Sequence, residues 1–186
     1  IIYAAGTYKV PANKNITITG AVAGVEFDMS KAVGIYASMT FNNVTFNYGN
    51  KNYVGLQHAG EMEYNNCTFN GQLFLYGTSE VFKNCTFNQT SKDAYNVWTY
   101  SAEYTEFNNC TFNSAGKSLL VYHESASVFN EVVINDSVFE ASELVAGKAA
   151  IEIDTSLTNG ANIEINNTSA NGFDAGSVSN NSLWNN

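Results

Sequence analysis

Apolar and polar residues alternate in a short pattern that recurs along the chain. The hexapeptide Asn-Asn-Cys-Thr-Phe-Asn occurs at 65–70 and 108–113, and Lys-Asn-Cys-Thr-Phe-Asn occurs at 83–88. Weaker copies lie at 42–47, 135–140 and 166–171. When the third residue of each copy is position 0, apolar residues occupy positions −5, −3, 0 and +2, and polar residues occupy −2 and −1. This pattern predicts two short strands joined by a two-residue bend.

Residues at equivalent positions resemble one another from copy to copy. Position 0 holds Val44, Cys67, Cys85, Cys110, Ser137 and Thr168, and position −3 holds Phe41, Tyr64, Phe82, Phe107, Ile134 and Ile165. Position +2 holds Phe46, Phe69, Phe87, Phe112, Phe139 and Ala170. Glu80 and Thr105 interrupt the apolar position −5. A constant hexapeptide with variable spacing is expected of a solenoid whose loops differ in length.

The two polar positions between the strands are occupied mostly by asparagine. Asn tolerates a positive φ angle better than other residues except glycine, so it suits a tight bend. Stacked copies would also bring the side-chain amides of successive bends within hydrogen-bonding distance of one another.

A third apolar segment follows each hexapeptide after a loop. The candidates are 53–58, 73–77, 95–99, 119–123 and 150–154, and we align Leu56, Leu75, Val97, Val121 and Ile153 as their inward residues. Three strands in each repeat predict an all-β parallel β-helix, that is, a solenoid with about six to seven coils. The chain of 186 residues is expected to form a single domain, 1–186.

The same alignment predicts an outward strip of aromatic and acidic side chains. Tyr76, Trp98 and Tyr122 fall in one column on consecutive coils, followed by Asp154, and Phe74, Tyr100, Glu124 and Glu152 flank this column. A contiguous exposed aromatic patch is typical of a binding surface. Rings beside carboxylates suit sugars, and they also suit a protein partner. The alternative is that loops cover the strip, which would make it part of the core.

The alignment also places both histidines, His58 and His123, in one column. They would lie three coils apart, which is too far to share a metal ion. We interpret them as hydrogen-bonding residues at strand ends.

The charge of the chain limits the classes of partner. All eight basic residues are lysine, and the formal net charge is −9. Such a surface repels phosphate backbones and lacks the bidentate arginine ligand, so we expect no nucleic-acid partner. Anionic polymers are also disfavoured unless a cation bridges them. The three cysteines share position 0 and have no zinc-site spacing, so we predict small buried thiols and no metal or cofactor.

The Asn-Asn-Cys-Thr-Phe pattern, its asparagine column and the opening segment 6–20 resemble right-handed parallel β-helix proteins of the pectate-lyase-like superfamily. Such domains occur in secreted bacterial proteins and phage proteins. The resemblance implies a right-handed helix but no single activity, because the superfamily includes lyases, glycoside hydrolases, tailspikes and non-catalytic surface repeats.

The catalytic signals that this resemblance would imply are weak in the sequence. Its lyases use an arginine base and acidic calcium ligands, and this chain has no arginine. A hydrolase needs two carboxyl groups about 5–9.5 Å apart. The nearest acidic cluster is Glu152 and Asp154, with Glu124 one coil away. We interpret it as a solvated strand face, and the alternatives are a calcium site and an active site. We therefore predict no catalytic residues.

Ten Asn-x-Ser/Thr sequences occur, but Asn43, Asn66, Asn84 and Asn109 belong to the predicted bends. We attribute them to the repeat, which favours a bacterial or phage origin. The sequence contains no membrane-spanning segment. The chain begins in a strand-like segment and ends without a clear cap, so we expect a piece of a longer protein.

These features favour a non-catalytic, adhesin-like module, monomeric as this fragment, of a secreted or cell-surface bacterial protein that binds a glycan or a host protein. The alternatives are a polysaccharide lyase or glycoside hydrolase, and a phage tail-fibre fragment that would trimerise.

Overall fold

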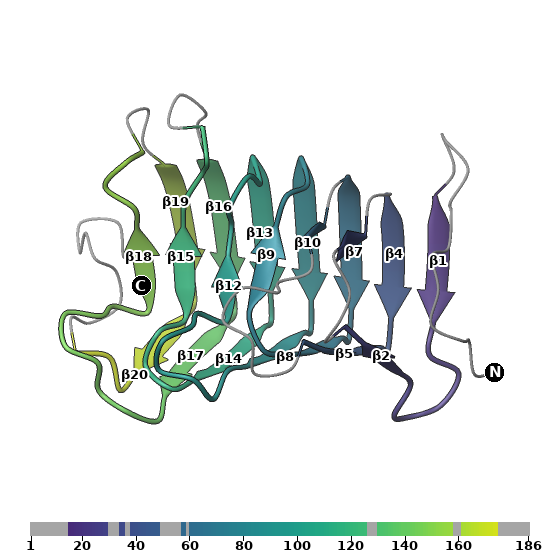
Figure 1. Ribbon diagram of the computed structural model, residues 1–186, viewed down its shortest axis with the longest axis horizontal. Coiled ribbons are helices and arrows are strands. Elements are labelled where there is room, and N and C mark those ends of the chain that lie inside the picture. The colour runs from purple at the N-terminus through teal and green to yellow at the C-terminus, as the bar shows by residue number, and fades with distance from the viewer. Residues whose placement is uncertain are drawn as a thin grey trace.

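The computed structural model describes residues 15–29, 34–35, 38–48, 57–58, 60–125, 130–157 and 161–174. All regular elements within these ranges are strands, and they form three parallel sheets (Figure 1). The chain visits the three sheets in rotation, so each strand pairs with the strands three positions before and after it. This arrangement confirms the all-β prediction and is the one expected of a parallel solenoid.

Sheets A and B contain the two strands on either side of the hexapeptide bend. Sheet A consists of β1 (Ile16–Thr19), β4 (Met39–Asn42), β7 (Glu61–Asn65), β10 (Ser79–Lys83), β13 (Tyr104–Asn108), β16 (Asn130–Asn135) and β19 (Ala161–Asn166). Sheet B consists of β2 (Glu26–Asp28), β5 (Thr45–Asn47), β8 (Thr68–Asn70), β11 (Thr86–Asn88), β14 (Thr111–Ser114), β17 (Val138–Ala141) and β20 (Ser169–Asn171). Sheet C consists of β3 (Gly34–Ile35), β6 (Gln57–His58), β9 (Leu73–Leu75), β12 (Val97–Trp98), β15 (Leu119–Val121) and β18 (Ile151–Ile153).

The bends between sheets A and B have the conformation that the asparagines predict. The residue at position −1 has a positive φ angle, between 47° and 56°, in all six copies. Its side-chain amide bonds along the stack, from Asn109 Nδ2 to Asn84 Oδ1 at 2.7 Å and from Asn66 Nδ2 to Asn43 Oδ1 at 3.2 Å. Similar amide ladders run along positions −2 and +3. The predicted hydrogen bonding between stacked amides is therefore confirmed.

The core consists largely of two ladders of stacked aromatic rings. The position +2 rings from Phe46 to Phe139 are all buried, and their successive centroids lie 4.2–5.0 Å apart with nearly parallel planes. The position −3 rings form a second ladder from Phe41 to Phe107. Edge-to-face contacts join the two ladders, as between Phe82 and Phe87 at 5.3 Å. Close packing of this kind is favourable beyond the area buried.

Polar groups also enter the core from sheets A and B. Glu80 lies in register with Met62 and Thr105 and is fully buried. Its Oε1 accepts a hydrogen bond from the Gly77 backbone N–H at 3.3 Å, and burial holds the pKa of its carboxyl well above the ordinary value. The three cysteines are buried and free, which confirms the prediction of buried thiols.

The predicted alignment of sheet C is wrong by two residues at Val97, although Val121 pairs with Ile153 as predicted. Val97 pairs with Leu73 and Leu119, whereas we had placed it beside Leu75 and Val121. Leu119 in turn pairs with Ile151. A shift of two residues keeps every side chain on the same face of a strand, so hydrophobic alternation cannot detect it. Loops of different length precede these strands, so no motif marks their register.

The same shift separates the two histidines. His58 pairs with Leu75, in the column that continues to Val121, whereas His123 lies two residues beyond Val121. Their placement in one column is therefore wrong. His123 Nδ1 accepts a hydrogen bond from the Ser125 backbone N–H at 2.9 Å, as expected of a residue at a strand end. The side chain of His58 lies outside the described residues.

Candidate functional site: an aromatic surface on sheet C

Six aromatic side chains are in mutual contact on the outer side of sheet C. We call them the aromatic surface: Phe74, Tyr76, Tyr95, Trp98, Tyr100 and Tyr122. Strand alternation accounts for most of this placement, because Leu73, Leu75 and Val97 are completely buried on the inner side. All five aromatic residues that the sequence analysis selected for this strip belong to the surface.

The rings form two rows, and not the single row that we predicted. Trp98 lies beside Phe74 and Leu120 in the register of sheet C. Tyr76 and Tyr100 stack in the adjacent row, with centroids 4.6 Å apart and an interplanar angle of 28°. Tyr122 continues that row at 5.4 Å from Tyr100 and also meets Trp98 edge to face at 5.7 Å. Tyr76 and Tyr122 thus share a row as predicted, but the assignment of Trp98 to that row is wrong by the same two residues.

Exposure divides the surface into a floor and a rim. Phe74 and Leu120 are only 5% and 8% exposed, so they form the floor, contrary to the expectation that Phe74 is outward and accessible. Trp98, Tyr76, Tyr100 and Tyr122 are half-buried and form the rim. Neighbouring segments therefore cover one side of the strip and leave the other side open, which combines the two alternatives that the sequence left.

On the covered side of the aromatic surface, a lysine contacts both a carboxylate and a tyrosine hydroxyl. Lys148 Nζ lies 2.8 Å from Glu152 Oε1 and 3.5 Å from the Tyr95 hydroxyl. Burial and the neighbouring Glu152 carboxylate hold the pKa of the Tyr95 phenol above its ordinary value, so it stays protonated. Glu152 is buried, and so it is not the accessible binding residue that we predicted. Alternation alone predicts a solvated position for Glu152, but Lys148 in the preceding segment packs against it.

The open side is bordered by the other two predicted acidic residues. Asp154 follows Ile153, which pairs with Val121, so Asp154 lies beside Tyr122. Asp154 Oδ1 accepts a hydrogen bond from the Ser156 backbone N–H at 2.8 Å. Glu124 is exposed, and its backbone N–H donates to the Tyr100 carbonyl at 2.8 Å. Within the described part of the chain, no three acidic, histidine or cysteine side chains are grouped to hold a metal ion.

Two features of the surface were missed by sequence reasoning. Tyr100 has a φ angle of 26°, in the left-handed region that non-glycine residues rarely occupy. No glycine or asparagine marks this turn, so the sequence contains no signal of it. Tyr95 shares the alternation of inward Val97, but it lies before β12 begins, where that alternation no longer applies. The positive φ angle of Tyr100 is a backbone feature that is enriched at functional sites.

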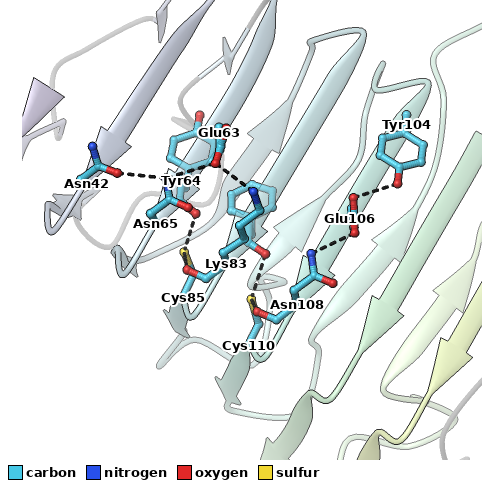
Figure 2. A network of polar contacts seen from close by, with 11 residues as sticks. Asn42, Glu63, Tyr64, Asn65, Lys83, Cys85, Tyr104, Glu106, Asn108 and Cys110 are labelled. Atoms are coloured by element: carbon cyan, nitrogen blue, oxygen red, sulfur yellow. Dashed lines mark hydrogen bonds and ion pairs between the residues drawn. The ribbon is translucent and has the colours of Figure 1, made fainter. Parts of the chain in front are cut away.

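The outer face of sheet A is chemically different. Lys83 forms an ion pair with Glu63 at 2.9 Å, and Glu106 accepts hydrogen bonds from Tyr104 and Asn108, each at 2.9 Å (Figure 2). The Lys83–Glu63 and Asn65–Asn42 contacts join neighbouring strands, whereas the contacts of Glu106 lie within β13. Among the described residues, sheet C is thus the face on which large rings remain partly exposed and pack mainly against one another.

Comparisons of the chain with protein-family models, with curated proteins and with solved structures found no match. Among the described residues, no helix is long and apolar enough to cross a membrane.

Proposed function

We propose that this chain is a non-catalytic, adhesin-like module of a secreted or cell-surface bacterial protein, and that its aromatic surface binds a glycan. We further propose a right-handed parallel β-helix of the pectate-lyase-like type, with about six to seven coils. The hexapeptide repeat and the three parallel sheets support this assignment of the fold.

One observation carries the proposed binding function. Trp98 is half-exposed among three half-exposed tyrosines, and all four rings are held by a parallel sheet or by the residues directly after its strands. Amphipathic rings of this kind offer apolar contact and hydroxyl groups together, which are the two requirements of sugar recognition. A rigid platform also lowers the entropic cost of binding.

A host protein is the second candidate ligand, because tryptophan and tyrosine also dominate protein interfaces. The lyase or hydrolase alternative has less support. Glu152 on β18 is buried against Lys148. Asp154, directly after β18, therefore has no second accessible carboxyl group beside it on that strand. The tail-fibre alternative requires copies of the chain to assemble as a trimer.

A glycan array with the purified chain tests the proposal. The Trp98→Ala variant should weaken binding to any recognised glycan by about 2 kcal/mol, as expected for a central aromatic anchor. Tyr76→Ala removes a ring from the rim and should weaken binding less. Because both rings also pack against neighbours, the melting temperature of each variant must be measured beside the affinity.

The matched control is Val22→Ala, which removes an apolar side chain that is 70% exposed at a distance in sequence from sheet C. This variant should bind as the unmodified chain does. Binding that survives both ring substitutions in folded protein would exclude the aromatic surface as the site, and binding to a protein partner alone would replace the glycan.

A further inference from the structure

Two carboxylates at one end of the aromatic surface have no cationic partner among the described residues. These are Asp154 and Glu124. The described lysines are engaged elsewhere: Lys83 with Glu63, Lys92 with Glu143, Lys148 with Glu152, and Lys117 over the Tyr95 ring at 5.6 Å. The chain contains no arginine that could compensate these charges.

The nearby His123 side chain is buried and faces the backbone of Ser125, whose N–H nitrogen and carbonyl oxygen lie 2.9 Å and 3.0 Å from Nδ1. Among the described residues, no lysine therefore pairs with the carboxylates at this end, where Glu124 is exposed and Asp154 is half-buried.

Tyr122 differs from the other tyrosines of the rim. Tyr76 and Tyr100 cover each other's faces by stacking at 4.6 Å. Tyr122 is inclined by 53° to Tyr100 and by 82° to Trp98, so it stacks on neither ring. It is also the last ring of its row, because the next strand places Asp154 beside it. Among the described rings, none therefore stacks on the face of Tyr122.

The carboxylates at this end interact with the Tyr122 ring. Burial raises the pKa of the Tyr122 phenol, and electrostatic interactions with Tyr100, Asp154 and Glu124 raise it further. Close by, the buried Glu152 has one oxygen, Oε2, that finds no hydrogen-bond donor within the described part of the chain. An aromatic face beside uncompensated carboxylates attracts an organic cation through both the ring quadrupole and the net charge.

We propose that the aromatic surface selects glycans that carry free amino groups, and that the ammonium group binds at Tyr122 between Asp154 and Glu124. This inference rests on the proposed glycan-binding function and specifies its ligand class. Glycans rich in carboxylate or sulfate groups are disfavoured by the same charges. Acetylation of the amine removes the positive charge and should remove the selectivity.

A lysine-rich peptide could supply the same ammonium group, but the rest of the surface favours a sugar chain. Three of the four rim rings carry hydroxyl groups, and Tyr76 and Tyr100 extend the row away from the acidic end. An oligosaccharide offers hydroxyls and C–H surfaces along this row, whereas a lysine side chain would use only the end at Tyr122.

Isothermal titration calorimetry with two oligosaccharides of equal length provides the test. One is a β-1,4-linked glucosamine oligomer and the other is its fully N-acetylated counterpart. At low salt the amine form should bind about tenfold more tightly, and added sodium chloride should reduce this difference. The double variant Glu124→Gln/Asp154→Asn should bind both oligomers equally. Its asparagine side chain keeps an Oδ1 acceptor for the Ser156 N–H, so the local turn is preserved.

The matched control is the double variant Glu61→Gln/Glu131→Gln, which removes two exposed carboxylates from the outer face of sheet A. It changes the net charge by the same amount and should keep the preference for the amine. Equal affinity for the two oligomers, or a preference that survives Glu124→Gln/Asp154→Asn, would overturn the inference.

The failure of this inference can be told apart from failure of the proposed function. If neutral glycans bind in a manner that depends on Trp98 while the amine gives no advantage, only the inference fails. If no glycan binds, the proposed function fails as well. A lysine-rich peptide that binds more tightly than the amine oligomer, with the same dependence on Asp154 and Glu124, would overturn the sugar as the source of the ammonium group.

Discussion

At the scale of single residues, the most informative position is Glu80, where the repeat pattern departs from apolar character. The sequence shows this departure but does not say where the side chain lies. In the structure the carboxyl is fully buried between the positions of Met62 and Thr105. The Gly77 backbone N–H donates a hydrogen bond to Oε1, and Oε2 is unpaired among the described residues. A buried acid with so few donors is stable in its neutral form.

Glu80→Gln should therefore change the pH dependence of stability. The pKa of Glu80 is raised in the folded state above its ordinary 4.5, so the folded state holds this proton more tightly than the unfolded state does. Stability is then fully present below pH 4.5 and falls as pH rises towards the folded-state pKa. The glutamine variant cannot ionise, so its free energy of unfolding should decline less over this range. Urea unfolding of both proteins between about pH 5 and pH 8 measures the effect.

Exposed Glu131→Gln serves as the control for the loss of one carboxylate. If the free energy of unfolding changes with pH by the same amount in Glu80→Gln and in the unmodified chain, then Glu80 is not a source of the pH dependence.

At the scale of elements, the bend and the ring ladder are the repeated units. Asn43, Asn66, Asn84 and Asn109 each combine a positive φ angle with a side-chain amide that bonds to a neighbouring copy, so asparagine satisfies two requirements at once. Each +2 phenylalanine from Phe46 to Phe112 stacks on the ring before it and the ring after it, so a single removal disturbs two contacts. The two kinds of contribution can be separated by substitution.

The bend is tested by comparing Asn84→Ala with Asn84→Gly. Both variants lose the acceptor for Asn109, but glycine adopts the φ angle of 54° without a steric penalty. The alanine variant should therefore be less stable than the glycine variant by about 1 kcal/mol. Chemical denaturation gives the two free energies. Equal values would mean that the amide ladder, and not the backbone conformation, explains the asparagine.

The ring ladder is tested by Phe87→Ala. The ring is completely buried between Phe69 and Phe112, so its removal should destabilise the protein by about 3–5 kcal/mol. Leu144→Ala, at a side chain that is 69% exposed, should change the free energy of unfolding little. A loss below about 1 kcal/mol for Phe87→Ala would contradict the packing described for this core.

At the scale of the whole molecule, the three sheets present chemically distinct outer faces. Sheet A carries paired polar and charged groups, the middle strands of sheet B carry threonine and asparagine, and sheet C carries the aromatic surface. A rigid stack with one aromatic face suits a binding module. A tail-fibre fragment would instead require a three-fold interface between copies.

The proposed module and the tail-fibre alternative differ in assembly. We expect the chain to sediment as a monomer in analytical ultracentrifugation, because a net charge of −9 opposes self-association. Raised salt screens this repulsion, so the measurement should be repeated there. A stable trimer under both conditions would favour the tail-fibre alternative over the adhesin-like module.

The sequence by itself determined the local structure of each repeat. Alternation identified the inward columns of sheets A and B, and the asparagine pairs located the bends, because both depend on neighbouring residues in one hexapeptide. Position 0 likewise identified the buried cysteines. In each case the motif marks its own register, so successive copies can be aligned without knowledge of the loops.

Only the tertiary structure decided the register of sheet C and the shape of the candidate site. Alternation has a period of two, so it assigned Tyr76, Trp98 and Tyr122 to the correct face but placed Trp98 in the row of the two tyrosines. Phe74 is buried beneath Trp98 and Tyr100 of the next coil, and Glu152 is buried against Lys148, which lies in the loop before β18. Loops and coils of unequal length bring these residues together, and the alternation within a strand does not specify such contacts.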